Sequence, residues 1–206
     1  MWDTARERMR IAVISDLHIG ADEFLPTGFG EFLDHLEQEY EEIILLGDVF
    51  ECYSPALPWR ALAEYDRLVR LHRNITDRFR SAKYTLLSGN HDMVLRRARG
   101  IPSRTERVHN GYRILLSHGH ENESAFGSAV KVRLVELYMW LAYRLKRVRL
   151  PALYDWSYRM DYERNMKDGG AAHVEAARRL VRGGYDVVVF GHTHVERHVE
   201  LREGGT

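Results

Sequence analysis

The sequence predicts an α/β fold, because short apolar segments alternate with longer stretches of helical periodicity. Five apolar segments rich in Val, Ile and Leu are typical of buried strands, and each ends in a short loop that contains Asp, Asn or His. The 206 residues are enough for one domain with a sizeable core but too few for two. We therefore expect a single domain over residues 1–206.

The first half of the chain contains three predicted strands and two predicted helices. Residues 10–14 are short and β-branched, which favours a buried strand. Residues 28–40 place apolar side chains at helical spacing, and residues 42–46 give a second strand. A long helix is expected over residues 58–80, because proline is suited to the first turn, and residues 83–87 give the third strand.

The second half contains a long helical stretch between its two strands. Residues 112–116 predict the fourth strand. Residues 121–168 contain no convincing strand and favour helices, with a break near Leu150-Pro151. A helix over residues 171–182 ends at Gly183-Gly184 and leads to the fifth strand, residues 185–190.

The five strand-end loops contain the groups that bind divalent metals. They are Asp16-Leu17-His18, Gly47-Asp48, Gly89-Asn90-His91-Asp92, His118-Gly119-His120 and Gly191-His192-Thr193-His194. Ligands bind at the carboxyl ends of strands in open α/β sheets, so we expect one sheet edge to gather all five loops. Carboxylate, amide and imidazole groups without thiolates suit borderline divalent ions.

Seven side chains in these loops are candidate metal ligands. If Asp48 bridges, the set supplies four ligands to each of two ions: Asp16, His18, Asp48, Asn90, His118, His192 and His194. Two ions held about 3.5–4 Å apart are typical of metal-assisted phosphoryl hydrolysis. Each residue alone suits a turn or a cap, but a purely structural role for the whole set is disfavoured.

Composition limits the partners and the compartment. Lys and Arg number 30, as do Asp and Glu, so no net charge attracts nucleic acid or an anionic membrane. The single cysteine, Cys52, excludes an intramolecular disulfide and fits a reducing compartment. The N-terminal segment lacks the apolar core of a signal peptide, and residues 137–143 are too short to span a membrane. These features predict a cytoplasmic protein.

The ordered pattern D-x-H, G-D, G-N-H-D, H-G-H, G-H-x-H resembles the calcineurin-like metallophosphoesterases. The resemblance implies a four-layer α/β/β/α sandwich of two mixed sheets, with residues 121–168 inserted as a helical cap. It also implies that one metal is bound by Asp16, His18, Asp48 and His194, and the other by Asp48, Asn90, His118 and His192. The cofactors would be two divalent ions, manganese first, although iron, zinc and cobalt accept the same ligands.

The chemistry that follows is phosphoester hydrolysis. Two cations neutralise phosphate oxygens and make a bound water more acidic. His91 is next to a ligand without being needed as one, so it is the candidate catalytic residue, as general acid or charge stabiliser for the leaving group. Glu51 stands where related protein phosphatases have an acidic residue that orients this histidine; a structural or solvated glutamate is the alternative.

The segment from Gly47 to Glu51 and the position of the cap resemble the UDP-2,3-diacylglucosamine diphosphatases. The sequence departs from that branch at His91, where those enzymes have arginine. The resemblance implies a phosphorylated small-molecule or lipid-linked substrate, such as a UDP-sugar lipid or a nucleotide diphosphate. Basic residues in the cap would then allow peripheral contact with the inner face of the membrane.

Other functions remain open. A phosphodiesterase or nuclease shares Gly-Asn-His-Asp, but no DNA-binding extension is evident, so no stable nucleic acid partner is expected. A general phosphomonoesterase is a further alternative. A protein phosphatase would show Asp-Arg-Gly after the bridging Asp48, and a metal-free interaction scaffold would lose ligands that are all present here. The oligomeric state stays open.

Several residues have two readings. His120 either supports a metal ligand or fills its loop, and five other histidines are expected at the surface or in the core: His35, His72, His109, His173 and His198. The basic run Arg96, Arg97, Arg99, Arg104 and Arg107 either recognises a second phosphate or forms a solvated face. Residues 195–201 are strand-like, and the sequence ends soon after, so an abbreviated second sheet or a truncated end is expected.

Overall fold

The chain forms two three-stranded sheets in a computed structural model. The structure describes residues 9–53, 56–147 and 170–200, and between the last two ranges it also describes residues 152, 155, 156, 159, 160 and 163. The first sheet is parallel in the order β1 (Ile11–Ile14), β2 (Glu42–Leu46) and β3 (Tyr84–Leu87). The second contains β4 (Arg104–His109), β5 (Tyr112–Ser117) and β6 (Val187–Phe190). Strand β5 pairs antiparallel with β4 and parallel with β6.

Apolar side chains from both sheets share one core. Ile44, Leu46 and Leu87 of the first sheet pack with Leu116 of β5, and all are at most 2% exposed. Strands such as β2 are apolar on both faces, because one face meets the other sheet and the other meets helices. The predicted α/β class is therefore confirmed.

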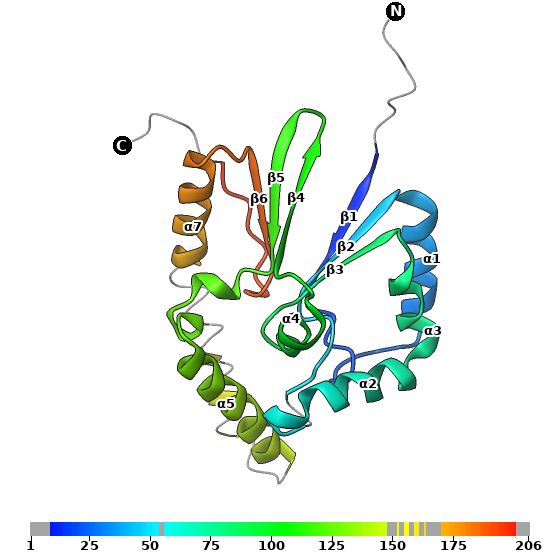
Figure 1. Cartoon of the computed structure of the whole chain (residues 1–206), viewed down its shortest axis with the longest axis vertical. Helices are drawn as coiled ribbons and strands as arrows, with labels where there is room; N and C mark the ends of the chain where they lie inside the picture. Colours follow the sequence, from blue (N-terminus) through cyan, green and yellow to red (C-terminus); the bar gives the residue numbers. More distant parts are fainter. Residues whose placement is uncertain are drawn as a thin grey trace, which may run out of the picture.

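Helices lie on the outer sides of the sheets (Figure 1). Helices α1 (Phe29–Glu39), α2 (Ala61–Leu71) and α3 (Arg73–Thr76) bury Leu33, Leu68 and Ile75 in a core with β2. Helix α7 (Ala171–Arg182) lies beside β6. Helix α1 and α7 match the predicted ranges closely.

The single helix predicted over residues 58–80 is wrong. The segment divides into a 3-10 turn at Pro58–Arg60, α2, α3 and a second 3-10 turn at Arg78–Arg80. The break falls at His72, whose φ of −109° and ψ of 36° are not helical. The chain changes direction there, and both Leu68 and Ile75 can then be fully buried.

The helical stretch after β5 begins with two 3-10 turns, His120–Asn122 and Ser124–Phe126, and continues as α5 (Ala129–Arg147). Figure 1 shows α5 beyond the point where the strands converge. The fully buried Glu136 of α5 pairs with Arg97 of α4 (Val94–Arg99) and with Arg133. The predicted break at Leu150-Pro151 lies outside the described residues, as does most of the chain from 148 to 169.

Two expectations about the second sheet are wrong. Strand β4 lies in the basic run, where no strand was predicted, and it is joined to β5 by Asn110-Gly111, both with positive φ. Asn-Gly is the preferred sequence of a tight hairpin turn, so a signal for this strand exists. Residues 195–200 were expected to be strand-like, but they form no regular element.

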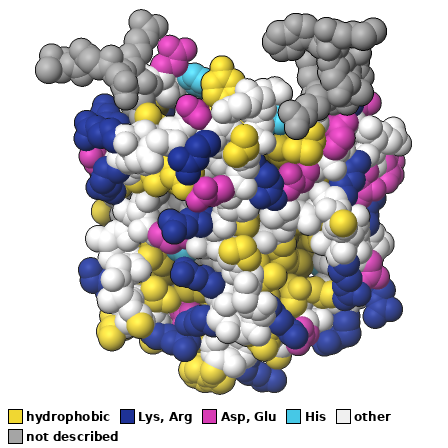
Figure 2. All heavy atoms as spheres, turned by 45° about the horizontal axis from the view of Figure 1, so that its top comes forward, with side chains coloured by type: hydrophobic (Ala, Val, Ile, Leu, Met, Phe, Trp, Pro, Cys, Tyr) yellow, Lys and Arg dark blue, Asp and Glu magenta, His cyan; other side chains and the backbone are white. Residues whose placement is uncertain are grey.

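The surface shows no region of a single charge on the face drawn in Figure 2, where basic and acidic side chains alternate with hydrophobic ones. This agrees with the balanced composition. Among the described helices, none combines the length and apolar character needed to cross a membrane.

Candidate metal centre

The predicted loops meet where the strands end, and backbone hydrogen bonds join them. Asp16 N–H donates to the carbonyl oxygen of Gly47 at 3.2 Å, and His18 N–H to that of Asp48 at 2.9 Å. Gly191 N–H donates to the carbonyl oxygen of His118 at 3.0 Å. Loops far apart in the sequence are thus held in fixed register at one edge, as predicted for ligand-binding loops of α/β sheets.

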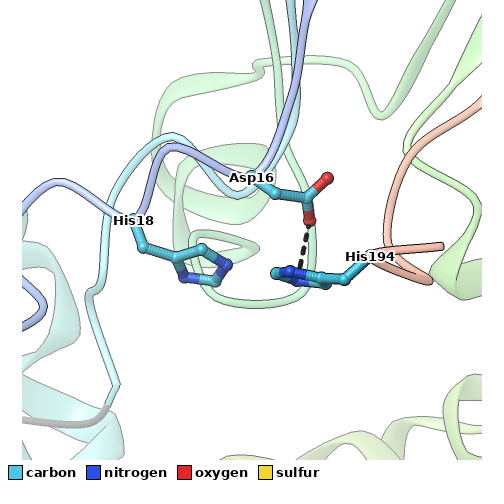
Figure 3. A group of neighbouring side chains, drawn as sticks. All are labelled: Asp16, His18 and His194. Carbon is cyan, nitrogen blue, oxygen red and sulfur yellow. Dashed lines mark ion pairs between the residues drawn. The ribbon is translucent and has the colours of Figure 1, made fainter. Parts of the chain in front are cut away.

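Asp16, His18 and His194 form the first cluster, in which the candidate ligand atoms lie within 4.8 Å of one another. Figure 3 shows the three side chains pointing toward a common centre, with His194 Nε2 at 3.3 Å from Asp16 Oδ1. The rings of His18 and His194 are stacked, with centroids 5.6 Å apart. The first and fifth loops therefore supply one predicted metal position.

Asp48, His118 and His192 form the second cluster, again within 4.8 Å. The Nε2 atom of His118 lies 3.1 Å from Asp48 Oδ2 and 3.1 Å from Asn90 Oδ1. His118 Nδ1 lies 2.9 Å from the carbonyl oxygen of Leu46, which can only accept, so Nδ1 donates. The Leu46 carbonyl thereby turns Nε2 toward the cluster, as backbone carbonyls do for metal-binding histidines.

Asp48, a member of the second cluster, is almost fully buried. Its Oδ1 accepts a hydrogen bond from His91 N–H at 2.7 Å. Burial alone would raise the pKa of Asp48, but the positive charges of His118, His91 and His18 outweigh it and hold that pKa well below its usual range. The carboxylate is therefore ionised, as a bridging metal ligand must be.

Glu51 joins two histidines of different loops. Its Oε2 lies 3.2 Å from His18 Nδ1 and 2.8 Å from His91 Nδ1, and the carboxylate is buried. Burial alone would lower the pKa of His91, but the charges of Glu51 and Asp48 raise it to about 10. Glu51 thus contacts both His91, as an orienting acid would, and the predicted ligand His18.

Asp92, the last residue of the Gly-Asn-His-Asp motif, ties two loops together. Its buried carboxylate accepts hydrogen bonds from Gly89 N–H at 2.6 Å, Val49 N–H at 2.9 Å and Phe50 N–H at 3.2 Å. Burial, together with the charge of Asp48, raises the pKa of Asp92 to about 6. Its role in this structure is to position the loops.

Sequence reasoning missed that Glu123 and His173 lie at the site. His192 Nε2 lies 3.2 Å from Glu123 Oε1, and its ring is 5.9 Å from that of His173. His120 is buried, with its ring 5.5 Å from that of His118. His173 comes from α7, where no motif marks it, so only the fold brings it to the centre.

Five of the seven predicted ligands have a positive φ angle: Asp16, His18, Asp48, His192 and His194. Among the described non-glycine residues, only Asn110 shares this conformation. Positive φ is unusual for side chains other than Asn and Asp and is concentrated at functional sites, where the surrounding structure enforces it. The backbone is therefore shaped to place these side chains.

The site fits divalent metal ions. His18 Nε2 is buried without a hydrogen-bond partner among the described residues, although it is a candidate ligand atom. Leaving buried polar atoms unsatisfied costs about 1–3 kcal/mol each, which a bound cation would remove. The donors are oxygen and nitrogen atoms, the set that manganese, iron, zinc and cobalt share.

Comparisons with known proteins bear on the family of the chain. No curated protein matches the chain. One solved structure, a conserved uncharacterized protein of Streptococcus pneumoniae TIGR4 described as a predicted phosphoesterase, matches with 18% identity over 61% of this chain and 53% of that one. Its TM-score of 0.30 is too low to support an argument. Residues 9–196 match the sequence model of the calcineurin-like phosphoesterases, and the chain therefore belongs to that family.

Proposed function

We propose that this protein is a phosphoester hydrolase that requires two divalent metal ions. The observation on which the proposal rests is that six of the candidate ligands form two clusters and that the seventh, Asn90, contacts His118, while His18 presents a buried, unsatisfied ligand atom. Asp16, His18, Asp48 and His194 would hold one ion, and Asp48, Asn90, His118 and His192 the other. Such ions supply Lewis-acid stabilisation of phosphate charge and a more acidic water.

His91 would act on the leaving group. Its Nδ1 is bonded to Glu51, so its proton at Nε2 remains available to a substrate. The pKa of about 10 keeps the ring protonated at neutral pH, and its side chain is 24% exposed, so a substrate can reach it. A cationic imidazole placed there either donates a proton to the leaving oxygen or stabilises its charge.

A lipid-linked or nucleotide diphosphate substrate is supported by the surface of α5. Apolar side chains recur at helical spacing on one exposed face and are 44–71% exposed: Val130, Leu134, Leu137, Tyr138 and Leu141. The last turn of α5 contains Arg144, Lys146 and Arg147, of which Lys146 pairs with Glu23 and Arg147 with Asp22. An amphipathic helix of this kind suits an acyl chain and peripheral contact with a membrane surface.

Substrate profiling tests both the proposed metal-dependent hydrolysis and the proposed substrate class. Purified protein supplemented with manganese is given p-nitrophenyl phosphate, its bis-ester, and UDP-linked sugars with and without acyl chains. We expect hydrolysis that a chelator abolishes, and faster turnover of the acylated substrate. Preference for the bis-ester would favour the phosphodiesterase alternative, and preference for the monoester would favour a phosphomonoesterase.

A matched pair of variants distinguishes an enzyme from an interaction scaffold. His194→Ala removes a predicted ligand, whereas His35→Ala changes an exposed histidine of α1. We expect only His194→Ala to lose bound metal and turnover. Protein that binds no metal and hydrolyses none of these substrates with manganese, iron, zinc or cobalt would instead be an interaction scaffold.

A further inference from the structure

A second cavity lies outside the metal centre, between the outer face of the second sheet and helix α7. Its volume is about 450 Å³, within the range of about 300–1,000 Å³ that small-molecule sites occupy. Residues from α4, β4, β5, the following turn, α7 and the end of β6 line it: Arg96, Ser103, Arg104, Leu115, Ser117, Glu121, Asn122, Ala176, Arg179, Leu180 and Phe190. None of the seven predicted metal ligands is among them.

Three arginines at this cavity have no partner of opposite charge. The side chains of Arg96, Arg104 and Arg179 make no hydrogen bond or ion pair with the residues that the structure describes. Exposed arginines can remain solvated at little cost, but three from separate elements around one cavity produce a concentrated positive potential. Guanidinium groups are also suited to bidentate binding of phosphate.

The other three arginines of the basic run are paired with carboxylates. Arg97 pairs with Glu136, Arg99 with Asp66 at 3.3 Å, and Arg107 with Glu42. These three therefore have roles within the protein, whereas Arg96 and Arg104 remain available at the cavity. Within the basic run, only Arg96 and Arg104 are therefore candidates for phosphate recognition.

The cavity also offers apolar contact and an unsatisfied donor. Leu115, Ala176, Leu180 and Phe190 provide an apolar lining. Asn122 Nδ2 is buried and has no hydrogen-bond partner among the described residues. The one lining carboxylate, Glu121, accepts a hydrogen bond from another lining residue, because its Oε2 lies 3.3 Å from Ser117 Oγ, and the same oxygen lies 3.6 Å from His120 Nδ1.

We propose that this cavity binds a phosphorylated small molecule, with Arg96, Arg104 and Arg179 around the phosphate and the apolar lining against the body of the ligand. The three arginines, the apolar side chains and the unsatisfied amide of Asn122 match an anionic group joined to an apolar body. This site is separate from the metal centre, and its existence does not depend on the hydrolase proposal.

Methyl NMR of the full-length protein tests the site directly, with phenylphosphonate as the probe. Its carbon–phosphorus bond is not a phosphoester, so hydrolysis does not consume it. We expect saturable shifts of the Leu115, Ala176 and Leu180 methyl signals. Leu17, which follows the predicted ligand Asp16, reports separately on any binding at the metal centre.

Arginine variants supply the matched comparison. Arg104→Ala and Arg179→Ala should each weaken binding at the cavity about tenfold, the effect of losing one charge-assisted hydrogen bond. Arg178→Ala is the control, because Arg178 is the neighbour of Arg179 on α7 but pairs with Glu175 at 3.7 Å and does not line the cavity. It should leave the affinity unchanged.

Three results would overturn the proposal. Cavity methyl signals that do not move at millimolar phenylphosphonate would show that no site exists. Equal shifts with neutral benzyl alcohol would show an apolar pocket without phosphate recognition. Equal weakening in Arg178→Ala would show a diffuse charge effect, and tighter binding of an oligonucleotide than of phenylphosphonate would assign the arginines to a nucleic acid backbone.

Discussion

The carboxylate of Glu51 lies 2.8 Å from Nδ1 of His91, and this contact fixes the orientation and charge of the proposed catalytic histidine. The two residues come from different strand-end loops, joined further by Cys52 N–H donating to the carbonyl oxygen of His91 at 3.1 Å. Glu51 is itself buried, and the histidines that surround it lower its pKa despite that burial. The buried carboxylate of Glu51 and the partly exposed imidazole of His91 thus form one unit.

Glu51→Gln tests this unit, because it keeps the shape but removes the charge. We expect the pKa of His91 to fall from about 10 and turnover to fall about 10–100-fold, the usual effect of losing a residue that orients a metal-site histidine. The alkaline limb of the rate profile should move to lower pH. Glu39→Gln, at an exposed residue of α1, is the control, and an unchanged profile in Glu51→Gln would mean that Glu51 does not set the charge of His91.

His91→Ala and Asp48→Ala should separate metal binding from proton transfer. We expect Asp48→Ala to lose metal and turnover together, because Asp48 is predicted to contact both ions. His91→Ala should retain its metal and lose about 10²–10⁴-fold in turnover. The loss should be smaller for p-nitrophenyl esters, whose leaving group needs little protonation, than for alkyl esters. Metal analysis beside kinetics measures both effects, and full activity in His91→Ala would remove it from the mechanism.

Gly89→Ala should destabilise the metal loop. A Cβ at Gly89 would lie 2.2 Å from Asp48 Oδ1 and 2.5 Å from the backbone nitrogen of Asp48, so one loop must move. We expect a loss of about 2–4 kcal/mol in the free energy of unfolding, measured by urea denaturation. Gly30→Ala, in α1 with no atom within 4 Å of its added Cβ, should be neutral or stabilising. Equal stability of both variants would contradict the close approach of the two loops.

The free energy of unfolding of the metal-free protein should fall as pH rises from about 6.5 to about 8.5. The lower limit is the ordinary pKa of histidine, and the upper limit is the ordinary pKa of cysteine. The folded-state pKa of His91 is about 10 and that of His118 about 9, both above the ordinary value for histidine. In this window the folded chain keeps protons on His91 and His118 that the unfolded chain has released, so the stability that these two histidines contribute is complete below the window and falls through it.

Urea denaturation across the window, with chelator present, measures this slope. Metal-loaded protein should show a weaker slope, because His118 must give up its Nε2 proton to bind a cation. A metal-free protein with constant stability from about pH 6.5 to 8.5 would contradict the charge pairing of Asp48 with His118.

Local sequence patterns predicted the central strand β2 but not the edge strand β4. Strand β2 was predicted at its observed bounds because five consecutive apolar or β-compatible residues precede Gly47. Strand β4 was missed because its sequence, RTERVH, is polar and alternates between exposed and half-buried side chains at a sheet edge. Residues 195–200, VERHVE, are also polar and were predicted to be strand-like, but they form no strand, so local sequence did not distinguish the two segments.

The candidate site likewise contains some residues that the local sequence predicts and others that only the fold brings together. Asp16, Asp48 and His118 each lie within two residues of a strand end, and a strand-end loop can be recognised from the local sequence. His173 and Glu123 could not be found this way, because they approach His192 only when α7 and the turn after β5 pack around β6. Likewise, the fates of Arg97 and Arg104 depend on the partners that folding brings to them.

The amino-acid sequence by itself determined the family of the protein, the α/β class and the loops that contain the candidate ligands, because each depends on residue type and short-range spacing. Only the tertiary structure decided which charges are paired, which polar atoms are buried without partners and which side chains share a cavity. Those properties depend on distances between residues that are remote along the chain, and such distances are set when the two sheets and their helices pack.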